Sequence, residues 1–226
     1  TWKYYGDEEE PKLHTGWFEA VPSKELNSDD HENGTTHWYY ANSKGEITIP
    51  TADGEVGVVK TIDGKSYLFN SDGEMVTGLR ILTYDGSKIT NISSEVDTAD
   101  TVKNMNSDTM KLVYFESNGA AKTGTTTITL DGTSYTFSFK SNGSPRGVGE
   151  TGISDAYIYQ NGLRLTADED TKYGVVTYKN ESYVVNEKGS IQKNKKNLKD
   201  ADETYYCTNA KGILLHSSTE KCTTKH

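Results

Sequence analysis

The chain has 226 residues, with 24 Lys and Arg against 33 Asp and Glu, which gives a formal net charge of −9. This acidic balance argues against nucleic acid as a partner, because surfaces that bind nucleic acid are rich in Lys and Arg. Only 33% of the residues are hydrophobic and the mean hydropathy is −0.74, which argues against one deep core of ordinary composition.

The apolar residues are largely aromatic. The chain contains 15 Tyr, 3 Trp and 5 Phe together with 21 Gly and 4 Pro, and disordered segments are poor in aromatic residues. We therefore expect a thin folded structure with an aromatic core and many tight turns. No run approaches the ~18 consecutive apolar residues of a spanning helix, so we expect no membrane insertion, and we expect any export signal to lie outside this sequence.

One pattern recurs along the chain. An aromatic and β-branched strand runs into Asn or Ser, then one or two polar residues, then Gly. Such a glycine supplies the positive φ that a hairpin loop needs. In chain order the seven strands end near turn glycines Gly45, Gly73, Gly119, Gly143, Gly162, Gly189 and Gly212.

Each of these units is interpreted as one β-hairpin, and an isolated hairpin is marginally stable in water, so the units are expected to stack. The sequence thus predicts an all-β, elongated array of stacked hairpins that forms a single domain over residues 1–226, with negligible helix. The long interval between Gly73 and Gly119 is expected to hold an irregular insertion at residues 83–110, which is rich in Thr, Ser, Asn and Asp.

The stretch from Gly57 to Gly78 reads GVVKTIDGKSYLFNSDGEMVTG. It resembles the cell-wall-binding repeat, also called the choline-binding repeat, whose pattern is roughly Gly-Trp, a short strand, Asp/Asn-Gly-Lys, Trp-Tyr-Tyr-Phe, a polar turn with Gly, and Met-x-Thr-Gly. Degenerate copies cover nearly all of the chain. The glucan-binding repeats of bacterial glucosyltransferases and the repeats of clostridial toxins are similar as well.

This resemblance implies a secreted or cell-surface module of a Gram-positive bacterium, associated with the cell wall, whose hairpins stack as a left-handed β-solenoid. It implies no cofactor. The implied partner is wall teichoic acid or another carbohydrate, with choline held in a cage of Trp and Tyr rings. The full-length protein could add a catalytic or adhesive domain.

An aromatic cage would attract a quaternary ammonium group by cation–π interaction, for which Trp is the best ring. Only Trp17 and Trp38 fill both tryptophan positions of one unit; Ser66, for example, replaces the second tryptophan in another. The candidate ligand-binding residues are therefore Trp2, Tyr5, Trp17, Trp38 and Tyr40, and Tyr4 and Tyr39 lie close to them in sequence. The alternative is that these rings only seal the interfaces between hairpins.

The sequence offers no catalytic motif, and we expect a chain that is not an enzyme. The five histidines share no metal-ligand spacing, and no metal site is expected. Acidic groups at residues 7–10, 29–32 and 168–170 could bind calcium or form solvated turns, and none follows a calcium-loop pattern.

Two features leave alternatives open. Cys207 and Cys222 could close a terminal loop as a disulfide or remain two free thiols. The cations Lys193, Lys195, Lys196 and Lys199 could touch an anionic wall polymer or form a solvated turn. The function most consistent with the sequence is wall attachment; the alternative is a structural stalk, an adhesin or a toxin-like array that recognises a host protein or glycan.

Overall fold

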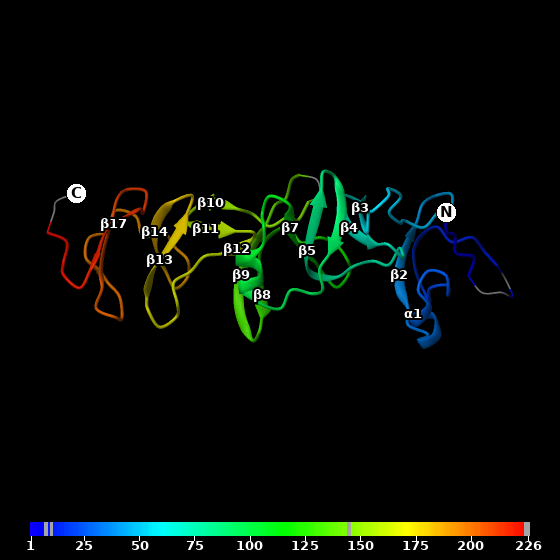
Figure 1. Cartoon of the computed structure of the whole chain (residues 1–226), viewed down its shortest axis with the longest axis horizontal. Coiled ribbons are helices and arrows are strands. Elements are labelled where there is room, and N and C mark those ends of the chain that lie inside the picture. Colours follow the sequence, from blue (N-terminus) through cyan, green and yellow to red (C-terminus); the bar gives the residue numbers. More distant parts are fainter. Residues whose placement is uncertain (7–8, 10, 144–145, 224–226) are drawn as a thin grey trace. The chain divides into compact units, whose positions relative to one another are not determined.

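The computed structural model describes residues 1–6, 9, 11–143 and 146–223. The chain divides into two compact units, one formed by residues 1–124 and 139–148 and the other by residues 125–138 and 149–226. The described residues form seventeen strands and two six-residue helices, so the all-β prediction is confirmed (Figure 1). Neither helix has the length or the apolar character needed to cross a membrane.

The first unit contains one hairpin and one five-stranded antiparallel sheet. The hairpin pairs β1 (Gly16–Ala20) with β2 (His37–Ala41), and helix α1 (Ser28–Asn33) lies in the loop between them. The sheet has the order β4-β3-β6-β5-β7. Its strands are β3 (Gly57–Ile62), β4 (Lys65–Asn70), β5 (Gly78–Asp85), β6 (Lys88–Ile92) and β7 (Met110–Phe115), and helix α2 (Ala99–Asn104) precedes β7.

The second unit contains three sheets. The largest has the order β10-β11-β12-β9-β8, and its strands β8 and β9 lie mainly in this unit. The strands of this sheet are β8 (Gly124–Leu130), β9 (Thr133–Phe139), β10 (Gly152–Ser154), β11 (Tyr157–Gln160) and β12 (Leu163–Arg164). The other two sheets are built from β13 (Tyr173–Tyr178) and β14 (Glu181–Asn186), and from β15 (Leu198–Lys199), β16 (Tyr205–Thr208) and β17 (Leu214–Ser218).

Residues 83–110 are more regular than the sequence predicts. They contain the end of β5, the whole of β6 and helix α2. Strands β5 and β6 are joined by a turn at Gly86-Ser87 and pair as a hairpin. The Thr98 side chain caps α2 by accepting a hydrogen bond from the Thr101 N–H. Val102 of α2 is fully buried. These elements correct the expectation of an irregular insertion: the segment has its own turn, cap and core residue.

The recurring Asn-x-x-Gly turns have one hydrogen-bonding pattern. The Asn side-chain oxygen accepts from the backbone N–H groups two and four residues later, at 2.8–3.1 Å. The Gly at the fourth position donates to the Asn carbonyl and has a φ between 73° and 88°. These turns begin at Asn42, Asn70, Asn186 and Asn209. Asn is favoured because it bonds its own turn, and Gly because it adopts positive φ without strain.

The same turns also connect one hairpin to the next. The residue two positions after a turn glycine donates its N–H to a carbonyl earlier in the chain, at 2.8–2.9 Å. The four pairs are Ile47 to Trp2, Met75 to Trp38, Ala121 to Ser66, and Ile191 to Ala156. The side chains of these donors lie against a later turn glycine, as Ile47 does at Gly73 and Ile191 at Gly212. Within each unit the hairpins are therefore stacked, as the sequence predicts.

Candidate functional site

Three half-buried aromatic rings meet around Trp17. Trp17 of β1 lies directly opposite Tyr40 of β2 in the strand register, and their ring centroids are 5.2 Å apart in an edge-on arrangement. The ring of Tyr67, from β4, lies 4.8 Å from Trp17 and is also edge-on. The buried ring of Phe69 supports Trp17 from 5.8 Å. We call Trp17, Tyr40 and Tyr67 the Trp17 cluster.

A cation of the protein itself already lies against this cluster. The Nζ atom of Lys60 is 5.5 Å from the centroid of the Tyr40 ring. Lys60 is on β3, in register with Tyr67 on β4. A cation within about 6 Å of a ring centroid is attracted by the negative face of the ring. The Tyr40 face is thus oriented to accept a positive charge.

The structure brings together only two of the five predicted ligand-binding residues, Trp17 and Tyr40. Trp38 and Tyr5 are 45% and 48% exposed, and none of the ring contacts in the described part of the chain joins them to the Trp17 cluster. Trp2 packs against the core around Phe18 and lines a small apolar pocket of about 60 Å³.

Two further rings near the amino terminus are structural. Tyr4 and Tyr39 stack on Phe18 from 4.9 and 5.6 Å, and they belong to the core of the first hairpin or pack against it. Tyr67, which the sequence analysis did not select, completes the Trp17 cluster instead. The sequence did indicate Tyr67, because in the clearest repeat it directly follows Ser66, at the place where the repeat pattern has Tyr after Trp.

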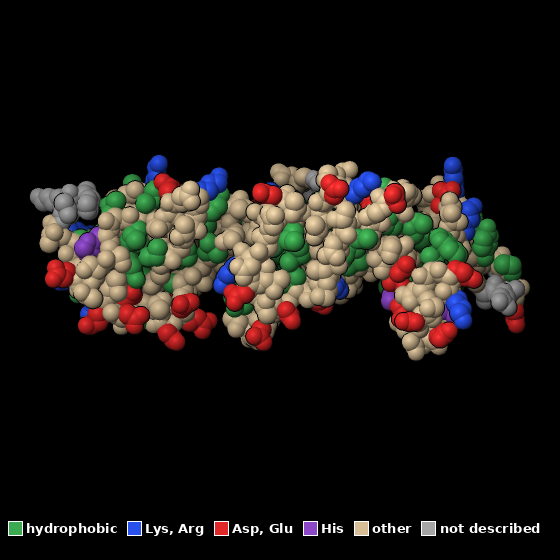
Figure 2. Space-filling model, in the orientation of Figure 1, with side chains coloured by type: hydrophobic (Ala, Val, Ile, Leu, Met, Phe, Trp, Pro, Cys, Tyr) green, Lys and Arg blue, Asp and Glu red, His purple; other side chains and the backbone are tan. Residues whose placement is uncertain are grey.

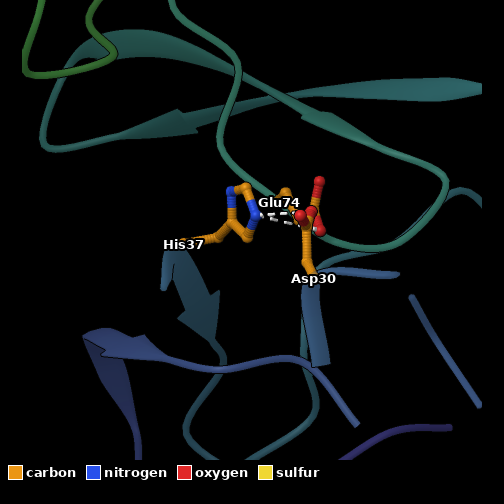
Figure 3. A group of neighbouring side chains, drawn as sticks. All are labelled: Asp30, His37 and Glu74. Carbon is orange, nitrogen blue, oxygen red and sulfur yellow. Dashed lines mark hydrogen bonds and ion pairs between the residues drawn. The ribbon is translucent and has the colours of Figure 1, made fainter. Parts of the chain in front are cut away.

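A second group of side chains gathers where α1, β2 and the turn after β4 meet (Figure 3). The Nε2 atom of His37 lies 2.9 Å from Oδ2 of Asp30 and 3.7 Å from Oε1 of Glu74. All three ligand atoms are within 4.8 Å of one another. We call Asp30, His37 and Glu74 the His37 cluster. Its members come from the first turn of α1, the first residue of β2 and the residue after turn glycine Gly73.

Two asparagines hold the carboxylates of this cluster. Asn27, the N-cap of α1, donates its side-chain amide to Asp30 Oδ2 at 2.8 Å and to Glu74 Oε1 at 3.0 Å. Asn70 donates to the other oxygen of Glu74 at 2.8 Å. Glu74 is only 8% exposed. The cluster is therefore a fixed arrangement rather than a group of mobile surface side chains.

The field around the His37 cluster is negative. Burial, and then the charge of Glu74, raise the pKa of Asp72. Burial, and then the charges of Glu74, Asp72 and Asp30, raise the pKa of the Tyr39 hydroxyl. Figure 2 shows acidic side chains gathered on the lobe that α1 occupies in Figure 1. The histidines share no metal-ligand spacing in the sequence, and the two carboxylates that the fold places beside His37 come from α1 and from the turn after β4.

The other charged groups singled out in the sequence do not form a comparable cluster among the described residues. Asp168, Glu169 and Asp170 are exposed, as are the cations of the lysine patch, where Lys199 pairs with Glu203 at 2.8 Å. Of the acidic run at 7–10, residues 7, 8 and 10 lie outside the described residues, and His226 does too.

The other three histidines have separate contacts. They are His14 beside the Tyr4 ring, His31 on the carbonyl of Pro22, and His216 on the carbonyl of Glu220. Cys207 and Cys222 form a disulfide, which settles the open question of a closed terminal loop.

No family model matches this sequence, and no curated protein matches it. Solved structures do. Choline binding protein F in complex with ipratropium is 19% identical, matches 95% of this chain and 54% of its own, and has a TM-score of 0.52. Another crystal form of choline binding protein F, from Streptococcus pneumoniae, is 19% identical over 91% of this chain and 49% of its own, with a TM-score of 0.50.

This chain has the choline-binding repeat fold. A third structure with this fold is the modular autolysin LytC of Streptococcus pneumoniae in complex with a synthetic peptidoglycan ligand, 12% identical over 95% of this chain with a TM-score of 0.50. The chain spans about half the length of choline binding protein F and 36% of the autolysin. At these identities the choline-binding repeat fold is shared although few side chains are.

Proposed function

We propose that this chain is a non-catalytic extracellular module that attaches a longer protein to the bacterial cell wall by binding quaternary ammonium groups of wall polymers. The observation that carries the proposal is the Trp17 cluster, in which three half-buried rings from different strands meet at centroid distances of 4.8 and 5.2 Å. The choline-binding repeat fold supports the same class of ligand.

The physical basis is cation–π attraction. Each ring that faces a desolvated cation contributes about 0.5–2 kcal/mol, and Trp contributes most. A choline headgroup is a cation that cannot donate a hydrogen bond, so it is recognised by ring faces rather than by polar partners. Choline-bearing teichoic acid is the wall polymer of this chemistry, and it is the partner that we propose.

The test is a titration of choline against the intrinsic Trp fluorescence of the protein, together with sedimentation on purified choline-containing wall. We expect a saturable response in the natural sequence that Tyr67→Leu abolishes. Trp38→Leu, which removes an exposed Trp outside the Trp17 cluster, is the matched control and should keep choline binding.

A variant of Lys60 provides a second test, in which choline binding should become stronger rather than weaker. The Lys60 ammonium group competes with an added cation for the face of Tyr40, so Lys60→Met should strengthen choline binding. Absence of both a choline response and wall retention in the natural sequence would refute the proposal. It would favour the stalk or receptor-binding alternative instead.

A further inference from the structure

We propose that Asp30, His37 and Glu74 form a binding site for a divalent transition-metal ion, for which Zn²⁺ is the reference ion. The site is separate from the Trp17 cluster, and the proposal does not depend on wall attachment. It rests on the chemistry of the three ligands, their spacing and the groups that hold them.

The spacing fits coordination to one ion. Zn²⁺ binds imidazole nitrogen and carboxylate oxygen at about 2.0–2.2 Å, so ligand atoms around a tetrahedral ion lie roughly 3.3–3.6 Å apart. The two distances from His37 Nε2, 2.9 Å to Asp30 and 3.7 Å to Glu74, fall on either side of this range. The third separation, between the carboxylate oxygens of Asp30 and Glu74, is at most 4.8 Å, so the three atoms would reach one ion by adjustment of these side chains.

The ligands are also supported as metal ligands usually are. Partners outside the coordination sphere fix the orientation of ligating carboxylates. Asn27 performs this role for both carboxylates and Asn70 for Glu74. A carboxylate oxygen has two lone pairs, so Asp30 Oδ2 can keep its bond from Asn27 and still bind the ion.

The charge of the site favours a cation. Asp30, Asp72 and Glu74 contribute three carboxylates to this region, and the ion pairs found among the described residues bring no Lys or Arg to any of them. Glu74 is largely withdrawn from solvent, and a buried carboxylate requires compensation by hydrogen bonds, a counter-charge or a metal. The protein itself supplies only the imidazole of His37 to Asp30 and Glu74 among the described ion-pair partners, and a divalent ion would add two positive charges.

The donor set selects the class of ion. One imidazole nitrogen with two carboxylate oxygens suits Zn²⁺ and its neighbours in the first transition row, whereas Ca²⁺ takes six to eight oxygens. Three protein ligands leave a fourth position for water. Binding replaces the contact between His37 Nε2 and Asp30 and requires Nε2 to carry no proton.

The test is calorimetric titration of Zn²⁺ into the untagged, metal-stripped protein. We expect one ion per chain, with affinity lowered at least tenfold by His37→Gln and by Asp30→Asn. Asp29→Asn changes the exposed neighbour on the same helix, and His216→Gln removes a histidine of the other unit. Both controls should keep the affinity.

Cobalt provides a second readout that does not depend on affinity. Co²⁺ in a site of low coordination number absorbs in the visible region, and this absorption should appear with the natural protein and vanish on addition of Zn²⁺ or in His37→Gln. The far-ultraviolet dichroism of each variant verifies that it is folded. Equal Zn²⁺ affinity in His37→Gln, preference for Ca²⁺ over Zn²⁺, or no binding at all would each overturn the proposal.

Discussion

Met75 packs directly against turn glycine Gly119, in the space that a side chain at residue 119 would need. Gly119 also has a φ of 78°, so two separate physical reasons exclude other residues there. The contact joins two stacked hairpins, because Met75 follows the turn of one and Gly119 forms the turn of the next.

We expect Gly119→Ala to destabilise the first unit by about 2–5 kcal/mol. Left-handed backbone costs an L-residue about 1–2 kcal/mol, and forcing a methyl group into packed atoms adds about 1–3 kcal/mol. The control is Gly64→Ala in the same unit, at a φ of 76° with open space around it, which should show only the backbone cost. Urea unfolding of the two variants measures the difference, and equal losses would contradict the stacking contact.

Tyr206 donates its hydroxyl to Asp200 at 2.7 Å, and both residues are buried. Tyr206→Phe should lower the free energy of unfolding by about 1–3 kcal/mol, because the carboxylate loses a buried donor. Tyr205→Phe, on the neighbouring residue, should have little effect. Comparison of denaturant midpoints at neutral pH measures both.

The Tyr206 contribution should also depend on alkaline pH. Burial and the bond to Asp200 raise the pKa of Tyr206 to about 12, above its ordinary value of about 10. A raised pKa means that the stabilisation is complete below pH 10 and is lost as the pH rises toward 12. The stability gap between the natural protein and Tyr206→Phe should therefore narrow across that window. A gap that stays constant would be inconsistent with this assignment.

Trp17 and Trp38 should differ sharply in their contribution to stability. Trp17 contacts three rings, so Trp17→Ala should cost about 2–4 kcal/mol, somewhat below the loss for a fully buried Trp. Trp38 is 45% exposed, and Trp38→Ala should cost less than about 1 kcal/mol. Thermal unfolding monitored by dichroism measures both, and a large loss for Trp38→Ala would show that its ring supports the fold.

Reduction of the Cys207–Cys222 disulfide should destabilise the second unit. The bond closes a loop of 15 residues, for which the loss of chain entropy in the unfolded state corresponds to about 3 kcal/mol. The double variant Cys207→Ser, Cys222→Ser should be equally destabilised and should not respond to reductant. If reductant leaves the melting temperature of the natural protein unchanged, the bond contributes no stability.

The turns could be predicted from sequence because their causes are local. Asn70 and Gly73 lie three residues apart, and the Gly73 N–H donates to the Asn70 carbonyl within the turn that they form. The residues that make the pattern in the sequence are therefore the same residues that make the turn. Helix α2 could not be predicted in this way. It has only six residues, and it is fixed by the Thr98 cap and by the burial of Val102 rather than by a periodic apolar stripe.

The same distinction between local and tertiary causes applies to the Trp17 cluster and the His37 cluster. Trp17 and Tyr40 are partners within one hairpin, so a search for aromatic residues in one unit found both. Tyr67 was missed because the search was for Trp at positions where this chain has Ser. His37 and Glu74 meet only because one hairpin stacks on another, and nothing in the sequence near His37 indicates Glu74.

The carbonyls of Trp2, Trp38, Ser66 and Ala156 accept equivalent hydrogen bonds from a later turn, although their side chains range from Trp to Ala. The bond uses only backbone atoms, so mutation at these positions leaves the joint between hairpins in place. Such an array can lose or gain an aromatic residue without losing the backbone hydrogen bond that joins its hairpins. Recognition can therefore diverge during evolution while the scaffold is inherited unchanged.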